Sequence, residues 1–173
     1  MIGLEHKKLQ SKRLTYRLLE EADKNALCDI LSDRSVTEPG GFLPAKSKEE
    51  FDEFFATLTR YNTGIAILLG DTLIGYIHVN RHRSELPEFR EKTGVMLGFV
   101  IGKAYQNHGY ATETLETVTA YLKQTFDYCA ADHFLDNEPS KRVIEKCGYR
   151  YLETYTMLFE ALGEEKTCLS YIR

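Results

Sequence analysis

The segment with the clearest chemical potential is Gln106-Asn107-His108-Gly109-Tyr110-Ala111. It follows an apolar run, Val95 to Ile101, and opens a helical pattern, Thr112 to Thr125. A strand, a glycine-bearing turn and a helix start in this order gather free backbone N–H groups at the positive end of a helix dipole. Such a cluster is suited to a phosphate or diphosphate group. A plain strand-to-helix turn has the same composition, so the turn alone leaves both interpretations open.

The elements around this turn predict a single mixed α/β domain over residues 1–173. Apolar periodicity predicts strands at 14–19, 65–69, 73–79, 95–101, within 126–135, at 149–159 and at 167–172, and helices at 20–32, behind Ser47, at 112–125 and behind Pro139. The strand 95–101 is rich in apolar residues, which predicts burial on both faces. The segment 38–44 is expected to be a loop, because it carries glycines and prolines.

Composition argues against several classes of protein. The net charge of −4 is unfavourable for general nucleic-acid or membrane-surface binding. The four cysteines are widely spaced and form no CxxC or Cys/His pattern, so we expect reduced thiols, a cytoplasmic protein and no metal site. Residues 1–8 lack the apolar core of a signal peptide. No apolar run reaches about 18 residues, so no membrane span is expected.

A second motif lies downstream of the turn. It reads Asn137-Glu138-Pro139-Ser140, followed by Glu145-Lys146-Cys147-Gly148-Tyr149. With Leu97-Gly98-Phe99 and the turn itself, it resembles the GNAT acyl-CoA N-acyltransferases, and within them the RimJ/RimL-type branch. The turn of that family reads Gln/Arg-x-x-Gly-x-Gly/Ala, and the branch carries Asn-x-x-Ser and Glu-Lys-x-Gly-aromatic. The resemblance covers nearly the whole chain, from residue 14 to residue 172.

The resemblance implies a fold and an activity. The fold would be the α/β (α+β) GNAT fold, a mixed, mostly antiparallel central sheet of about seven strands flanked by about four helices. The activity would be transfer of an acetyl group from acetyl-CoA to a primary amine, by direct attack in a ternary complex. The acceptor would be a small-molecule amine or a protein N-terminus, and the enzyme a monomer or homodimer that needs no metal, nucleic acid or membrane. Two alternatives stay open: a non-catalytic acyl-CoA-binding or regulatory module, and an α/β ligand-binding domain without coenzyme A.

The resemblance also assigns residues to the site. Coenzyme A is expected to contact Phe99, Val100, Ile101, Gln106, Asn107, His108, Gly109, Tyr110, Ala111, Thr112, Asn137 and Ser140. The turn would hold the diphosphate, since Gly109 lets the backbone approach without a Cβ in the way. The strand would offer backbone groups to pantetheine. In the family, a bulge at the positions of Phe99 and Val100 turns a backbone amide toward the thioester oxygen. The resemblance therefore implies two catalytic residues: Phe99, as the oxyanion donor, and Ser140.

Several positions depart from the family pattern. Asn107 and His108 stand where glycine and lysine are frequent; asparagine tolerates a left-handed backbone, and histidine replaces a fixed charge by a titratable one. Ile144 stands where many members have the tyrosine that protonates the thiolate, so Ser140 is expected to assist instead.

Met96 stands where the branch often has a glutamate. A water chain could serve as the base, and five side chains are open candidates, each with a surface or structural role as the blander explanation: Glu38, His78, His82, Asp132 and His133.

Three assignments have structural alternatives. Asn137 could cap the following helix rather than bond a pantetheine amide, and the Ser140 hydroxyl could bond its own backbone. The three phenylalanines at helical spacing behind Ser47 could wall a substrate groove, but that spacing is more typical of core residues: Phe51, Phe54 and Phe55.

Overall fold

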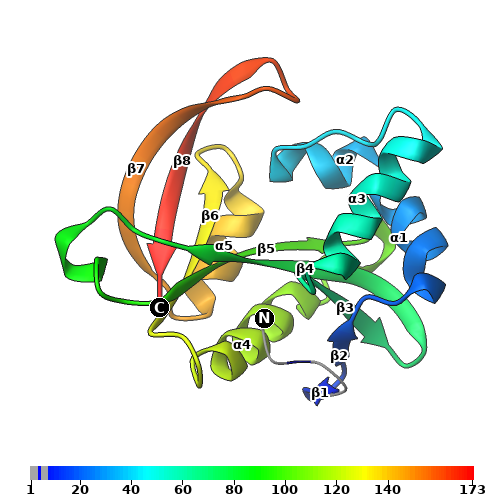
Figure 1. Ribbon diagram of the computed structural model, residues 1–173, viewed down its shortest axis with the longest axis horizontal. Helices are drawn as coiled ribbons and strands as arrows, with labels where there is room; N and C mark the ends of the chain where they lie inside the picture. The colour runs from blue at the N-terminus through cyan, green and yellow to red at the C-terminus, as the bar shows by residue number, and fades with distance from the viewer. Residues whose placement is uncertain (1–3, 5–7) are drawn as a thin grey trace.

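The computed structural model describes residue 4 and residues 8–173 (Figure 1). The strands are β1 (Leu9–Gln10), β2 (Thr15–Leu18), β3 (Gly64–Leu69), β4 (Thr72–His82), β5 (Gly94–Ile101), β6 (Tyr128–Phe134), β7 (Arg150–Phe159) and β8 (Glu164–Ile172). The helices are α1 (Lys24–Leu31), α2 (Arg34–Thr37), α3 (Lys48–Arg60), α4 (Tyr110–Leu122) and α5 (Glu138–Lys146), with short 3₁₀ turns η1 (Glu21–Asp23), η2 (Glu38–Gly40), η3 (Pro87–Phe89) and η4 (Lys103–Tyr105). The expectation about residues 1–8 falls mostly on residues 1–3 and 5–7, which lie outside the described part.

One sheet runs through the molecule in the order β1-β2-β3-β4-β5-β6-β8-β7. Neighbouring strands are antiparallel except β5 and β6, which are parallel. The fold class and every predicted strand are therefore confirmed. The eighth strand is β1, a two-residue strand on the sheet edge, too short for hydrophobic periodicity to indicate.

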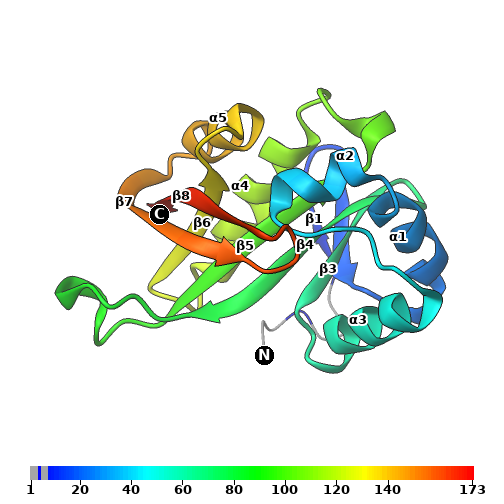
Figure 2. The same ribbon diagram turned by 90° about the horizontal axis from the view of Figure 1, so that it is seen from above.

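Helices cover the sheet on both sides (Figures 1 and 2). Helices α4 and α5 pack on one face, here called the α4 face, over a core that includes Leu115, Val118 and Ile144. Helices α1 and α3 pack on the other, the α1 face. Phe51 and Phe55 lie in the α1-face core, which confirms the core interpretation of those aromatic residues.

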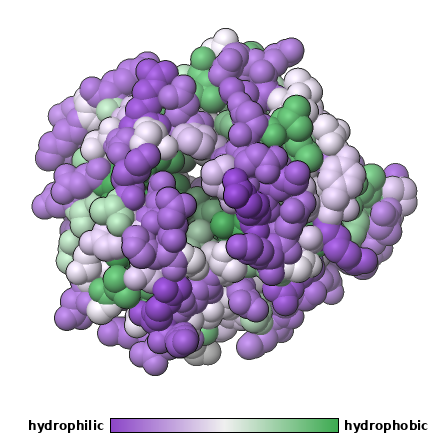
Figure 3. Space-filling view, turned by 180° about the vertical axis from the view of Figure 1, so that it is seen from behind, coloured by the Kyte–Doolittle hydropathy of each residue, from purple (hydrophilic) through white to green (hydrophobic). Residues whose placement is uncertain are grey.

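The middle of the sheet opens between β5 and β6. Their parallel pairing covers only Gly94–Met96 against Tyr128–Ala130, after which β6 continues along β8 and separates from β5. In the same stretch β5 stays paired to β4 as far as Ile101, without a register shift. The expected bulge at Phe99 and Val100 is therefore wrong, because divergence of β6 makes the opening. In the view from behind, the surface is hollowed near its middle, with apolar residues inside (Figure 3).

Three smaller expectations change. Residues 38–40 are not a loop: they form η2, since proline is tolerated in a first helical turn, and left-handed Gly41 (φ 87°) ends it. The predicted helix 20–32 begins as η1, where Glu20 and Asp23 form a reciprocal capping box. Strand β5 is not buried throughout, since Gly98 is exposed.

The four thiols are unpaired and three are buried. No described helix has the length and apolar character needed to cross a bilayer.

Candidate functional site

The turn before α4 has the geometry of an anion site. Asn107 (φ 64°) and Gly109 (φ 80°) both adopt the left-handed backbone, so asparagine does take the conformation expected of it. Gly109 is the N-cap of α4, and no side chain caps this end. The N–H groups of the first turn, from Tyr110 to Thr112, are thus left for a ligand at the positive end of the helix dipole.

Two side chains of the turn hold its shape. The Gln106 side-chain amide donates to the Ile101 carbonyl oxygen at 3.0 Å, which fastens the turn to the end of β5. The ring Nδ1 of His108 donates to the Gln106 carbonyl oxygen at 2.7 Å. The same ring stacks on Tyr110, with centroids 5.7 Å apart. Gln106 and His108 are therefore committed to internal contacts as well as lying in the expected site.

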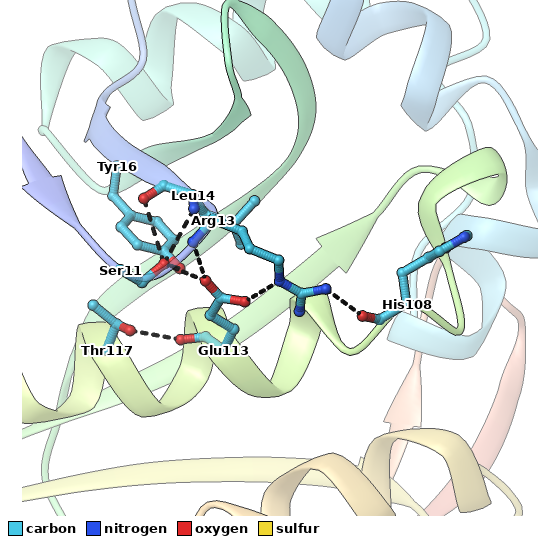
Figure 4. A network of polar contacts seen from close by, with 7 residues as sticks. All are labelled: Ser11, Arg13, Leu14, Tyr16, His108, Glu113 and Thr117. Atoms are coloured by element: carbon cyan, nitrogen blue, oxygen red, sulfur yellow. Dashed lines mark hydrogen bonds and ion pairs between the residues drawn. The ribbon is translucent and has the colours of Figure 1, made fainter.

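A cation from the N-terminal part of the chain lies against the turn (Figure 4). Arg13 donates from Nε to Glu113 on α4 at 2.7 Å and from one terminal nitrogen to the His108 carbonyl oxygen at 3.0 Å. Its guanidinium carbon is 4.5 Å from the centre of the Tyr110 ring. A Cβ placed on Gly109 would lie 3.5 Å from the other terminal nitrogen. The guanidinium of Arg13, itself paired with Glu113, therefore lies beside the turn in which His108 stands.

Glu113 fixes that arginine in place. Its carboxylate also accepts hydrogen bonds from the Ser11 hydroxyl and the Arg13 backbone N–H, both at 2.7 Å. Burial alone would raise the pKa of Glu113, but the hydrogen bonds from Ser11 and Arg13 outweigh it and hold that pKa below its ordinary value. This network could not be predicted from the sequence, because no local spacing links residues that are 100 positions apart.

The edge of β5 that faces the split carries free backbone groups. Gly102 N–H donates to the Ile74 carbonyl oxygen at 2.8 Å, in register with the β4–β5 ladder. In an antiparallel ladder alternate residues turn both backbone groups toward one neighbour, so the even-numbered residues of β5 bond β4. Phe99 and Ile101 turn the other way, beyond the last rung with β6. They leave N–H groups that no described residue accepts.

The same alternation removes one expected contact. Val100 is even-numbered, pairs with Tyr76 and is buried in the α1-face core. Its backbone groups serve the ladder, so the expectation that Val100 offers a backbone group to pantetheine is wrong. Phe99 is the residue at the centre of the free edge.

Asn137 and Ser140 lie across the split from this edge, at the end of β6 and the start of α5. The Asn137 side-chain oxygen accepts the Ser140 backbone N–H at 3.1 Å, and its amide donates to the Pro39 carbonyl oxygen at 2.9 Å. Asn137 is therefore a helix cap, the structural alternative, and it ties η2 to α5. The Ser140 hydroxyl is half-buried and forms no hydrogen bond within the described chain, so it is not occupied by its own backbone.

The five candidate bases differ in their surroundings. Glu38 is paired with Arg34 at 2.8 Å, and that hydrogen bond lowers its pKa. His82 contacts the Tyr128 hydroxyl at 3.2 Å, and buried His133 donates to the Phe134 carbonyl oxygen. The remaining two, His78 and Asp132, lie on the strands that flank β5. No three His, Cys, Asp or Glu side chains gather as a metal site in the part of the chain that the structure describes.

Comparison with known proteins places the chain among characterised domains. Residues 13–150 match the family model described as acetyltransferase (GNAT) domain. The fold matches an acetyltransferase (GNAT family) from Bacillus anthracis with a TM-score of 0.78 and 21% identity, over 96% of this chain and 97% of that one. It matches the spermidine N-acetyltransferase from Vibrio cholerae, solved with CoA and spermine, with a TM-score of 0.77 and 15% identity, over 94% and 96%.

A further match is to the ribosomal-protein-alanine N-acetyltransferase from Brucella melitensis, with a TM-score of 0.69 and 16% identity, over 91% of this chain and 98% of that one. No curated protein sequence matches the chain. At these identities the solved structures bear on the fold alone, whereas the family match spans most of the chain.

Proposed function

The chain belongs to the GNAT acetyltransferase family and is therefore an acyltransferase, and we propose that it transfers the acetyl group of acetyl-CoA to a primary amine by direct attack in a ternary complex. The acceptor we propose is a protein N-terminus or a small-molecule amine. We place the chain in the RimJ/RimL-like branch, on the strength of Asn137-x-x-Ser140 and the Glu145–Tyr149 run. One such domain would comprise residues 1–173.

One observation supports the proposal: the uncapped start of α4, with its free N–H groups, and the free edge of β5 lie at the same split in the sheet. The first-turn N–H groups of α4 and the Arg13 guanidinium suit a diphosphate. The free edge of β5 at Phe99 and Ile101 suits the two amides of a pantetheine arm, in the manner of an added strand. The diphosphate and the pantetheine arm of the proposed donor match these two features.

The chemistry then needs few groups. The neutral amine attacks the thioester carbonyl carbon, and the Phe99 N–H is placed to stabilise the oxyanion that develops. The carbon–sulfur bond breaks, and the leaving thiolate takes a proton. Ser140, with its unoccupied hydroxyl at the start of α5, would assist that protonation, while Ile144, at the usual tyrosine position, is fully buried and apolar. Asn137 would act mainly by holding α5 and η2 in place.

Ser140→Ala is expected to lower kcat roughly tenfold, because general-acid help is modest when the leaving group is a thiolate. The KM for acetyl-CoA should change much less, since the hydroxyl acts on the transition state. Steady-state kinetics with Ser140→Thr as the hydroxyl-retaining control would check this. Wild-type turnover in Ser140→Ala would remove Ser140 from the mechanism.

Arg13→Met is expected to raise the KM for acetyl-CoA roughly three- to tenfold, equivalent to ~1 kcal/mol. The variant removes the fixed charge beside the turn and one hydrogen bond that holds it. Lys12→Met is the matched control, since Lys12 is the neighbouring exposed cation. Equal KM values for the two variants would show that Arg13 does not support the diphosphate.

The activity itself is tested by release of free thiol from acetyl-CoA in the presence of primary amines. We expect release that depends on the amine, and an acetylated amine detectable by mass spectrometry. Tight binding of CoA without transfer to any polyamine, aminoglycoside or free peptide N-terminus would instead indicate a non-catalytic binding module.

A further inference from the structure

The acceptor has to approach from the α1 face. Helix α4 packs on the α4 face, so a diphosphate at its N-terminus lies on that side of the sheet. A pantetheine arm that passes through the split between β5 and β6 brings its thioester to the opposite face. The side chains that meet the amine are therefore those of β4, β5 and β6 that point to the α1 face.

Gly98 forms an open floor at this point. It lies on β5 between Met96 and Val100, whose side chains belong to α1-face clusters, and it is exposed. A Cβ placed on Gly98 would meet no atom within 4 Å, so the space above it is empty of protein. The last rung between β5 and β6 is Met96 to Ala130. Asp132 is thus the next α1-face residue of β6 beyond the rung.

Two hydrogen bonds hold the Asp132 carboxylate in position, but no cation among the described residues is paired with it. Tyr155 donates its hydroxyl to one carboxylate oxygen at 2.5 Å, and Ser170 donates to the other at 2.8 Å. Burial, together with the hydrogen bond to Asp132, raises the pKa of Tyr155, so the phenol keeps its proton and remains a donor. Over the residues described, no Lys, Arg or His forms an ion pair with this half-buried carboxylate. A ligand cation would supply the ion pair that Asp132 lacks.

His78 lies beside Gly98 on β4, the neighbour of β5 on the side away from β6. It is the β4 partner of Gly98 and lies two residues from Tyr76, which packs in the α1-face core. His78 is paired with Gly98 across the β4–β5 ladder, where neighbouring strands lie about 4.8 Å apart. Asp132 lies on β6 two residues beyond the last rung, where β6 leaves β5, so His78 and Asp132 lie on opposite sides of the split beside Gly98. Burial lowers the pKa of the His78 ring, and within the described chain the ring has no hydrogen-bond partner. A neutral imidazole without a partner can accept a proton.

We propose that the acceptor binds over Gly98 as a cationic primary amine, with its ammonium held by Asp132 and with His78 as the group that takes its proton. This acceptor site, called the seat below, rests on the proposed function and specifies the substrate class of that function. The ammonium gives one proton to the imidazole, and the neutral nitrogen forms a bond to the thioester carbon. The carbon–sulfur bond then breaks, the nitrogen loses its second proton, and the thiolate gains one. The products are the N-acetyl amine, the free thiol and one proton released from His78 to solvent.

The seat is tested by Asp132→Asn, assayed with spermidine and with an amidated alanine tripeptide as separate probes. The KM for whichever probe the wild-type enzyme acetylates faster is expected to rise at least tenfold, while the KM for acetyl-CoA stays within twofold. Asp136→Asn is the matched control, because it removes an exposed carboxylate four residues after Asp132 in the sequence. A KM for the amine that is the same in both variants would overturn the seat and leave the proposed function standing.

His78→Gln supplies an independent readout. Its kcat is expected to fall at least tenfold at pH 7 and progressively less toward pH 9.5, where the amine is increasingly neutral and needs no base. A deficit that is constant over this range would remove His78 from proton transfer. Wild-type enzyme that binds CoA but acetylates no polyamine, aminoglycoside or free peptide N-terminus would overturn the seat together with the proposed function.

Discussion

Gly109→Glu is expected to lower the affinity for CoA at least a hundredfold, or ~2.7 kcal/mol. The new carboxylate would lie beside the first-turn N–H groups of α4 and next to Arg13, which is 3.5 Å from the Cβ position. There it would compete for the cation and repel the diphosphate. Two like charges about 4 Å apart repel by roughly 4 kcal/mol near a protein surface. Isothermal titration of CoA would measure the loss.

The variant needs a control for backbone strain, because Gly109 has a left-handed backbone (φ 80°). Gly163→Glu is the matched change: Gly163 also has a positive φ (70°), with no atom near its Cβ position, in the turn between β7 and β8. Both variants should lose a similar amount of thermal stability. Equal CoA affinity in the two would contradict the assignment of the diphosphate to the turn.

Phe99→Pro is expected to reduce kcat by roughly 10²- to 10³-fold, the usual effect of losing one oxyanion donor. Proline removes the N–H at the free edge of β5 without removing a bond to β4, since Phe99 faces the split. Phe99→Ala removes the ring but keeps the N–H, so the ratio between the two variants isolates the backbone donor.

A second proline variant tests which way the backbone groups of β5 face. Val100→Pro removes a group that serves the β4–β5 ladder, and it should unfold the protein or lower its Tm far more than Phe99→Pro does. Similar kcat values for Phe99→Pro and Phe99→Ala would exclude the Phe99 amide from catalysis. Similar melting temperatures for the two proline variants would contradict the alternation on which the argument depends.

The sequence was sufficient for the parts of the fold that rest on local periodicity. Strands such as 65–69 and helices such as the one behind Ser47 carry their apolar pattern within one window, and the structure has them near the predicted bounds. Residues 38–40 were harder, because glycine and proline indicate a turn but do not distinguish a 3₁₀ turn from an open loop. The turn before α4 was predictable because its strand, glycine and helix start are contiguous.

Features that depend on distant residues were out of reach. Arg13 reaches Glu113 and His108 because the segment between β1 and β2 lies against the start of α4, and no spacing in the chain indicates that. Whether Phe99 or Val100 faces the split depends on the register of the β4–β5 ladder, and a one-residue difference reverses it. The two hydroxyls on Asp132 come from β7 and β8, 23 and 38 residues away.

The most direct measurement is a crystal structure of the protein with CoA bound. It should place the diphosphate on the N–H groups of residues 110–112 beside Arg13, with the pantetheine arm between β5 and β6 and the thiol over the split near Phe99 and Gly98. CoA bound elsewhere, or bound with its thiol on the α4 face, would contradict the proposed donor site and the direction from which the amine attacks.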